Sequence, residues 1–194
     1  MLTDPKSHSL DFDIAFEIIA PSIPGYGFSE QPHKKGFDSI ATARIFNHLM
    51  TERLGFKQYL AQGGDWGSLI VSTLGRYYST NLIGIHINMA FISPFDSCKH
   101  FILSLIGCYK PEWATKPDTV ENFLSKNIFN SKYVNIPTAY AAFPYDIGGA
   151  TPKELIQLNY NLTQMTIFSD GGHFAAFEMP KELANDILNF GLKF

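Results

Sequence analysis

The sequence predicts an α/β fold with a mostly parallel sheet of about five strands and helices on both faces. Short apolar runs have the length of buried strands, segments of helical periodicity lie between them, and a glycine-rich turn joins a strand to a helix. Strands that alternate with helices favour parallel pairing, because each helix returns the chain to the starting edge of the sheet. The expected strands are residues 14–21, 57–61, 82–89, 133–142 and 162–168.

Length and charge limit the classes of protein that fit. The chain has 194 residues, which suits a single domain covering residues 1–194. Its 15 Lys and Arg and 18 Asp and Glu give a formal charge of −3 without a basic stripe, so nucleic acid is not an expected partner. No apolar run approaches the roughly 18–20 residues of a membrane span, and we expect a soluble chain as written.

The first elements have clear boundaries in the sequence. Residues 14–21 are a short apolar run that ends at a proline, as a buried strand does. Residues 39–54 repeat apolar side chains at helical spacing, with Asp38 or Ser39 as the N-cap and Gly55 as the stop. The next run, 57–61, enters a tight glycine turn, and a helix over 66–77 follows that turn directly. Together these last two elements make one βα unit.

The second half continues the alternation. Strands are expected at 82–89, 133–142 and 162–168, and a helix closes the chain over about 181–192. Another helix opens at Thr151-Pro152-Lys153-Glu154, with Thr151 as the cap and proline in the first position. Residues 94–132 show no clear strand, and we interpret them as a shortened lid or cap region.

Gly63-Gly64-Asp65-Trp66-Gly67 has the pattern of a nucleophile elbow, a strained strand-to-helix turn that displays its central side chain. The central residue is Asp65, where esterases carry serine. A carboxylate that attacks a saturated carbon leaves an ester, which water can cleave. It also needs no base for activation, because an ordinary aspartate has a pKa of about 3.9. Taken alone, the turn fits a helix-capping aspartate equally well.

Two further residues follow strand ends. His173 comes after the last expected strand and two glycines, at the edge of the sheet where ligands bind in α/β folds. Asp146 follows the preceding strand and can accept a hydrogen bond from the imidazole, as the third member of a triad does. The order Asp65, Asp146, His173 is the hydrolase order of nucleophile, acid and base. An exposed loop aspartate and a structural histidine are the alternative interpretations.

The sequence resembles the microsomal-type epoxide hydrolases, including the juvenile-hormone epoxide hydrolases, within the α/β-hydrolase fold. This resemblance implies a partial α/β-hydrolase fold, with Asp65 as the nucleophile, His173 as the base, Asp146 as the orienting acid and the Trp66 N–H as an oxyanion donor. The matching stretches are Pro21–Ser29, Lys35–Arg44, Gln62–Ile70, Lys116–Val120, Ala142–Pro144 and Gly171–Glu178.

The activity implied by the resemblance is the hydrolysis of epoxides to diols. Asp65 would open the ring to form an ester, and water deprotonated by His173 would cleave that ester. The implied partners are a small apolar epoxide and water, without a cofactor or a metal. Cys98 and Cys108 fit buried free thiols better than a metal site. The resemblance also implies the endoplasmic reticulum membrane as the location, through a family anchor that would precede Met1.

The sequence departs from the family pattern in two places. The family's His-Gly-x-Pro loop and first strands would precede Met1, and the lid region is short, with Tyr109 as the nearest candidate for a lid tyrosine. We therefore expect a truncated form that is poorly stable and nearly inactive alone. A non-catalytic hydrolase-like remnant is the first alternative. A haloalkane dehalogenase is the second, although only Trp66 and Trp113 could serve as its halide-binding pair.

Overall fold

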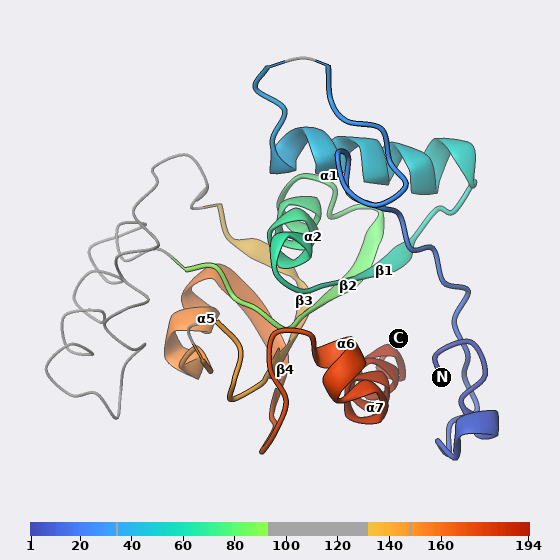
Figure 1. The fold of residues 1–194 in the computed structure, drawn as a ribbon, viewed down its shortest axis with the longest axis vertical. Helices are drawn as coiled ribbons and strands as arrows, with labels where there is room; N and C mark the ends of the chain where they lie inside the picture. Colours follow the sequence, from blue (N-terminus) through green and yellow to red (C-terminus); the bar gives the residue numbers. More distant parts are fainter. Residues whose placement is uncertain (34, 93–131, 148) are drawn as a thin grey trace, which may run out of the picture.

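A computed structural model describes residues 1–33, 35–92, 132–147 and 149–194. In this part of the chain a parallel sheet has four strands in the order β1-β2-β3-β4 (Figure 1). The sheet confirms the predicted α/β fold class. The strands are β1 (Tyr59–Gly63), β2 (Leu82–Ile87), β3 (Val134–Ala142) and β4 (Tyr160–Ile167).

The helices lie near their expected positions. The predicted helix over 39–54 is α1 followed by one π-helical segment, η2, and Gly55 ends it with a φ of +78°. Asp38 is the N-cap, because its side chain accepts the N–H of Ala41 at 2.9 Å. The helices are η1 (Lys6–His8), α1 (Ser39–His48), η2 (Leu49–Arg53), α2 (Trp66–Tyr77), α5 (Lys153–Asn159), α6 (Ala175–Glu178) and α7 (Pro180–Gly191).

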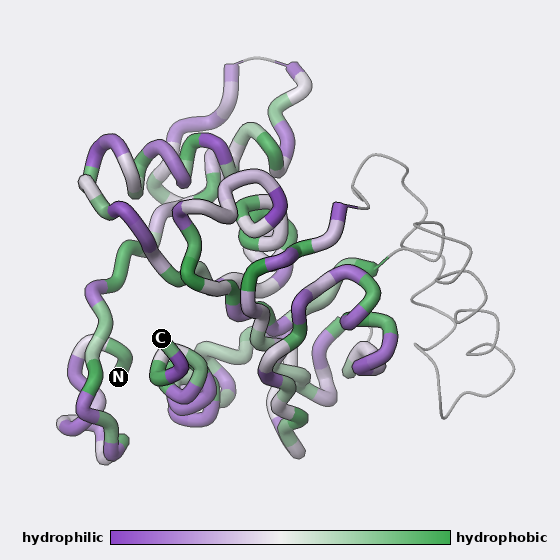
Figure 2. The backbone as a smooth tube through the Cα atoms, turned by 180° about the vertical axis from the view of Figure 1, so that it is seen from behind, coloured by the Kyte–Doolittle hydropathy of each residue, from purple (hydrophilic) through white to green (hydrophobic). Residues whose placement is uncertain are grey.

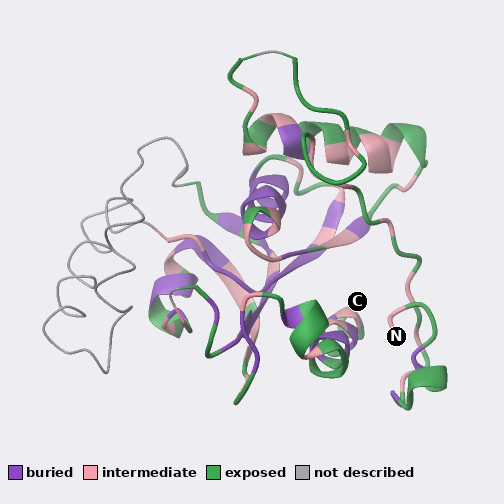
Figure 3. Ribbon diagram, in the orientation of Figure 1, coloured by how far each residue is buried: buried purple, intermediate pink, exposed green. Residues whose placement is uncertain are grey.

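Helix α2 lies between α1 and the sheet and is almost entirely buried (Figure 3). Its apolar side chains share one core cluster with inward-facing residues of all four strands. Helices α6 and α7 build a second cluster with Ala141 and Phe143. Because consecutive strand residues face opposite sides, this cluster covers the other face of the sheet. Helices therefore cover both faces, as predicted.

The strand predicted at residues 14–21 is wrong. This segment is mostly apolar, with Glu17 as its one hydrophilic residue, and it runs beside the described sheet without pairing with any of its strands (Figure 2). Ile14 and Phe16 pack instead against a cluster that includes Leu188 of α7, and the Phe16 N–H donates to the carbonyl of Leu2. A strand needs a partner for its backbone, and without one the described sheet has four strands, not five.

The cap predicted for the helix at 151 is also wrong. Pro152 is the N-cap of α5, and it makes no side-chain hydrogen bond there. The N–H of Thr151 instead donates to the hydroxyl of buried Tyr140 at 3.1 Å, which ties the segment before α5 to β3. The helix therefore begins one residue later than the pattern suggested, without a side-chain cap, and Thr151 contacts β3 through its backbone N–H.

The expected lid, residues 94–132, lies almost entirely outside the described residues, as do Cys98, Cys108, Tyr109 and Trp113. The single-domain assignment of residues 1–194 stays a prediction. Within the described part of the chain, no helix is both long enough and apolar enough to span a membrane.

Candidate active site

Asp65 lies in the sharp turn between β1 and α2. Its φ of +46° and ψ of −128° are unusual for a residue with a side chain, and such strain gathers at functional sites. The carbonyl of Asp65 accepts the N–H of Ser68 at 2.9 Å, which closes the first turn of α2 over the strained residue. The turn thus has the elbow geometry that the sequence pattern predicted.

Two glycines make this turn possible because neighbouring atoms leave no room for side chains. A Cβ on Gly63 would lie 2.4 Å from the carbonyl carbon and oxygen of Gly67. A Cβ on Gly64 would lie 2.6 Å from the amide nitrogen of Asn88, which follows β2. Asn88 is buried and accepts a hydrogen bond from Gln62 at 3.1 Å, so its side chain supports the turn from below. No sequence pattern marks the contact between Gln62 and Asn88, since the two residues are 26 positions apart.

His173 follows β4 and lies between the two aspartates. Its Nδ1 is 2.6 Å from Oδ1 of Asp146, and its Nε2 is 3.4 Å from Oδ2 of Asp65. The three residues predicted as nucleophile, base and acid therefore meet at one place. They meet because β1, β3 and β4 are parallel, so the loops that follow them leave the same edge of the sheet.

The exposure of the three side chains increases from Asp146 through His173 to Asp65. Asp146 is only 4% exposed, His173 is 21% exposed, and Asp65 is 48% exposed. Oδ1 of Asp146 also accepts the N–H of Ile147 at 2.7 Å, while its Oδ2 is buried without a hydrogen bond to any described residue. Asp146 is thus held beneath the imidazole, and the carboxylate of Asp65 is open to a reactant.

The electrostatics of the site favour a cationic imidazole. The hydrogen bond from His173 to Asp146 raises the pKa of His173 above the ordinary histidine value. The negative charges of Asp146 and Asp65 act in the same direction, whereas partial burial of the imidazole opposes them. An imidazole with this environment can accept a proton from water and remain stabilised once it carries the charge.

Trp66 is the first residue of α2. The first N–H groups of a helix have no carbonyl partner within the helix, and they carry its positive dipole end. The Trp66 N–H therefore has the local environment of an anion donor beside Asp65. Among the described residues, no group of three or more His, Cys, Asp and Glu side chains could hold a metal ion.

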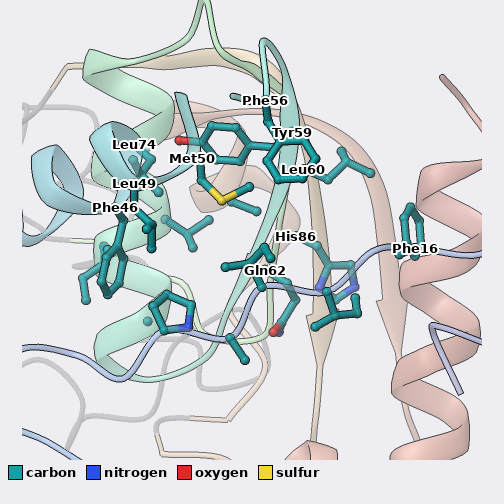
Figure 4. A pocket seen from close by; sticks show the side chains of 18 of the residues that line it. Phe16, Phe46, Leu49, Met50, Phe56, Tyr59, Leu60, Gln62, Leu74 and His86 are labelled. Carbon is teal, nitrogen blue, oxygen red and sulfur yellow. The ribbon is translucent and has the colours of Figure 1, made fainter. Parts of the chain in front are cut away.

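A cavity of about 660 Å³ lies elsewhere, along the outer edge of β1 (Figure 4). Apolar side chains from the 16–23 segment, α1, η2, β1 and α2 line most of it, and His86 and Gln62 add polar groups. None of the three residues Asp65, Asp146 and His173 is among its lining residues. The carboxylate of Asp65 therefore does not open into this cavity.

A family model and two similar curated proteins place this chain in the same family. The family model of the alpha/beta hydrolase fold matches residues 7–178. Epoxide hydrolase 1 of Oryctolagus cuniculus is 32% identical over 98% of this chain and 63% of the relative. Juvenile hormone epoxide hydrolase 2 of Ctenocephalides felis is 30% identical over 100% of this chain and 61% of the relative. The chain thus spans less than two thirds of the length of these relatives.

Solved structures agree with the sequence matches. The crystal structure of juvenile hormone epoxide hydrolase from Bombyx mori superposes with a TM-score of 0.78 at 26% identity, over 95% of this chain and 67% of that chain. The Aspergillus niger epoxide hydrolase shares the fold, with a TM-score of 0.69 at 23% identity over 97% of this chain and 66% of that chain. The chain therefore belongs to the α/β-hydrolase fold family, and these relatives within that family are epoxide hydrolases.

Proposed function

We propose that this chain hydrolyses epoxides to diols through a covalent ester on Asp65. The observation that carries the proposal is the contact of His173 with two carboxylates, one at each ring nitrogen, while Asp65 lies in a strained elbow. A mechanism through a covalent ester needs an exposed nucleophile and a base that can activate a water molecule next to the ester's carboxyl carbon. The names of the relatives support an epoxide as the substrate.

In the first step, an Asp65 oxygen attacks one ring carbon from the side opposite the C–O bond. That bond breaks with its electrons on the ring oxygen, which becomes a hydroxyl by taking a proton from solvent water. The proton that Asp65 releases when it returns to the carboxylate after ester hydrolysis restores this balance. The product is a hydroxyalkyl ester on Asp65. This step consumes no proton from His173, because the carboxylate is already the nucleophile.

In the second step, Nε2 of His173 takes a proton from water, and the resulting hydroxide attacks the carboxyl carbon of Asp65. Asp146 stabilises the imidazolium that forms, and the Trp66 N–H donates to the oxyanion of the tetrahedral intermediate. A donor of this kind is typically worth about 10²–10³ in rate. Collapse releases the diol, which recovers the proton from His173, and Asp65 keeps one oxygen from water.

A small apolar epoxide is the substrate class that the surroundings favour. Trp66, Tyr145 and Phe174 are direct chain neighbours of the three site residues, and all three present exposed aromatic side chains. Such side chains contact apolar groups favourably and offer no charge that would select an ionic substrate. An epoxide on an aromatic or alkyl skeleton fits this environment.

Trapping the ester tests the proposal. In His173→Ala, ring opening remains possible, but the base that activates water is gone, so the ester on Asp65 should accumulate. Mass spectrometry after incubation with excess styrene oxide should find the adduct on the peptide that contains Asp65. His33→Ala, which changes an exposed histidine far along the chain, is the matched control and should not accumulate it. An adduct on another residue, or none in any variant, would contradict the proposal and favour a non-catalytic remnant.

We also propose that the protein acts at the endoplasmic reticulum, because its sequence resembles microsomal-type epoxide hydrolases. Membrane and soluble fractions of cells that make this protein, probed with an antibody, would test the proposal. Co-sedimentation with an endoplasmic reticulum marker supports it, and recovery wholly in the soluble fraction contradicts it.

A further inference from the structure

His173 belongs to no helix or strand, so its position depends on the backbone on either side of it. On the preceding side, Gly172 forms an isolated parallel bridge with Tyr145, and the Tyr145 N–H donates to the carbonyl of Gly171 at 3.1 Å. This bridge ties the loop of His173 to the loop of Asp146. The bridge holds the two loops side by side, independently of the contact between the His173 and Asp146 side chains.

On the following side, the support comes from Glu178. Its Oε1 accepts the N–H of Phe174 at 2.9 Å, and its own N–H donates to the carbonyl of Phe174 at 2.9 Å. Phe174 is the N-cap of α6 and has no side-chain oxygen with which to cap the helix. Glu178 reaches back to the N–H of the N-cap residue, as the acidic residue of a capping box does, although it lies four residues after the N-cap instead of three.

The same carboxylate also lies against the residue before His173. A Cβ placed on Gly172 would be 3.2 Å from Oε2 of Glu178. One oxygen of Glu178 thus binds the residue after His173, and the other lies against the residue before it. Glu178 is exposed to solvent, and its carboxylate touches both chain neighbours of the histidine.

We infer that Glu178 is a positioning residue, which holds the backbone of His173 so that the imidazole spans Asp146 and Asp65. Its kinetic importance rests on the proposed function, because the position of the ring limits a rate only if His173 is the base. Nε2 lies 3.4 Å from Oδ2 of Asp65, so the ring position decides where the activated water meets the ester. A displacement of about 1 Å in a reacting group can cost on the order of 10²-fold in rate.

Three substitutions of Glu178 separate the effect of its side-chain length from the effect of its charge. Glu178→Gln keeps an acceptor oxygen at the same reach but loses the charge, whereas Glu178→Asp keeps the charge and shortens the side chain. Glu178→Ala loses both. Glu182→Ala is the matched control, because Glu182 is an exposed glutamate in the first turn of α7 and loses the same charge. Circular dichroism shows which variants fold, and the two conservative variants keep the test open if Glu178→Ala does not.

The first measurement is the titration of the His173 imidazole by NMR, which requires no turnover. The pKa of His173 is raised mainly by its hydrogen bond to Asp146, so it reports whether the two side chains still meet. Glu178→Gln and Glu182→Ala should keep the raised value, and Glu178→Asp and Glu178→Ala should lower it. If Glu178→Gln and Glu178→Ala lower the pKa of His173 equally and Glu178→Asp keeps the parental value, the effect comes from the charge of Glu178, and the inference is overturned. Parental values in all variants would also overturn it.

The second measurement is the rate at which the Asp65 ester is hydrolysed. In Glu178→Asp and Glu178→Ala this rate should fall on the order of 10²-fold, and in Glu178→Gln and Glu182→Ala it should stay near the parental rate. If the parent forms no ester while the titrations change as described, the proposed function fails and the positioning role of Glu178 stands. If the ester forms in all variants and its hydrolysis is unchanged, the positioning role fails and the proposed function stands.

Discussion

The glycines of the elbow give a prediction whose size follows from the structure. In Gly63→Ala, the new Cβ would lie 2.4 Å from the carbonyl carbon and oxygen of Gly67 and 2.9 Å from the nitrogen of Ser68. Carbon atoms in ordinary contact are about 3.5–4.0 Å apart, so the overlap exceeds about 1 Å. The opposing atoms are backbone atoms of α2, so either β1 or α2 must move.

Movement there also threatens the hydrogen bond from the Ser68 hydroxyl to the carbonyl of Gly63, which is 2.7 Å long. Overpacking of this kind costs about 1–3 kcal/mol, and the unyielding backbone places Gly63→Ala near the upper end, at about 3 kcal/mol. The free energy of unfolding of a domain is about 5–15 kcal/mol in total, so this loss is a large fraction of its stability. The same movement displaces Asp65, so ester formation should fall as well.

Gly67 provides the opposite case in the same turn. A Cβ at Gly67 meets nothing within 4 Å, and the residue lies in α2. Alanine is better than glycine in a helix interior by about 0.8–1.0 kcal/mol, and Gly67 lies in the first turn of α2, so Gly67→Ala should stabilise the chain by less than that amount. Urea unfolding followed by circular dichroism gives both free energies of unfolding. A Gly63→Ala variant as stable as Gly67→Ala would refute the close packing of β1 on α2.

Three further outcomes are expected. Asp146→Asn should slow hydrolysis of the Asp65 ester more than its formation, because the imidazolium of His173 loses its partner; stopped-flow separation of the two phases checks this, and an equal slowing of both would contradict it. The rate constant of ester hydrolysis should rise with pH, with a midpoint above the ordinary histidine pKa of 6.5, because only neutral His173 accepts a proton. A pH profile of single turnovers measures this rate constant. A midpoint at or below 6.5 would be inconsistent with the Asp146 contact. Asp38→Ala should destabilise the chain by about 1 kcal/mol through loss of the cap of α1, measured as a shift in the urea midpoint at constant slope, and an unshifted midpoint would show that the cap contributes nothing.

The raised pKa of His173 also sets the sign of a stability change. A group whose pKa is higher in the folded state stabilises the fold fully below its unfolded pKa, and this contribution is lost as the pH rises through the folded pKa. The stability difference between the parent and His173→Ala should therefore be larger at pH 5 than at pH 9. Urea unfolding at the two pH values measures that difference, and a larger difference at pH 9 would contradict the assigned direction.

Local patterns were sufficient for the βα unit. The helix over 66–77 was predicted to the residue, because a glycine turn marks its start and helical spacing marks its extent. The segment 14–21 has an equally clear local pattern and is not a strand, because strand formation depends on a partner that its own residues do not specify. The capping bond expected from Thr151 is absent because the N-cap position falls on Pro152, one residue further on, and the segment before α5 is held to β3 by the Thr151 N–H, a tertiary contact that the local pattern does not specify.

The candidate site was predictable as residue types at strand ends. The elbow pattern marked Asp65, and the loops after two further strands marked Asp146 and His173. The sequence could not give the 2.6 Å and 3.4 Å separations, which depend on how parallel strands bring distant loops together. Asn88 was not predicted, and Glu178 belonged to a matching stretch without an assigned contact. Both residues act through backbone and packing contacts, which no chemical motif predicts.

The most direct test of the central claim follows an oxygen atom through one turnover. A single turnover with the protein in excess over styrene oxide, in water enriched in ¹⁸O, separates ester chemistry from direct attack by water. Hydroxide attacks the carboxyl carbon of Asp65 in the proposed reaction, so the first diol should carry unlabelled oxygen and the label should enter Asp65. Mass spectrometry of the diol and of the peptide that contains Asp65 reads both outcomes. A labelled diol from the first turnover with no label in Asp65 would contradict the account.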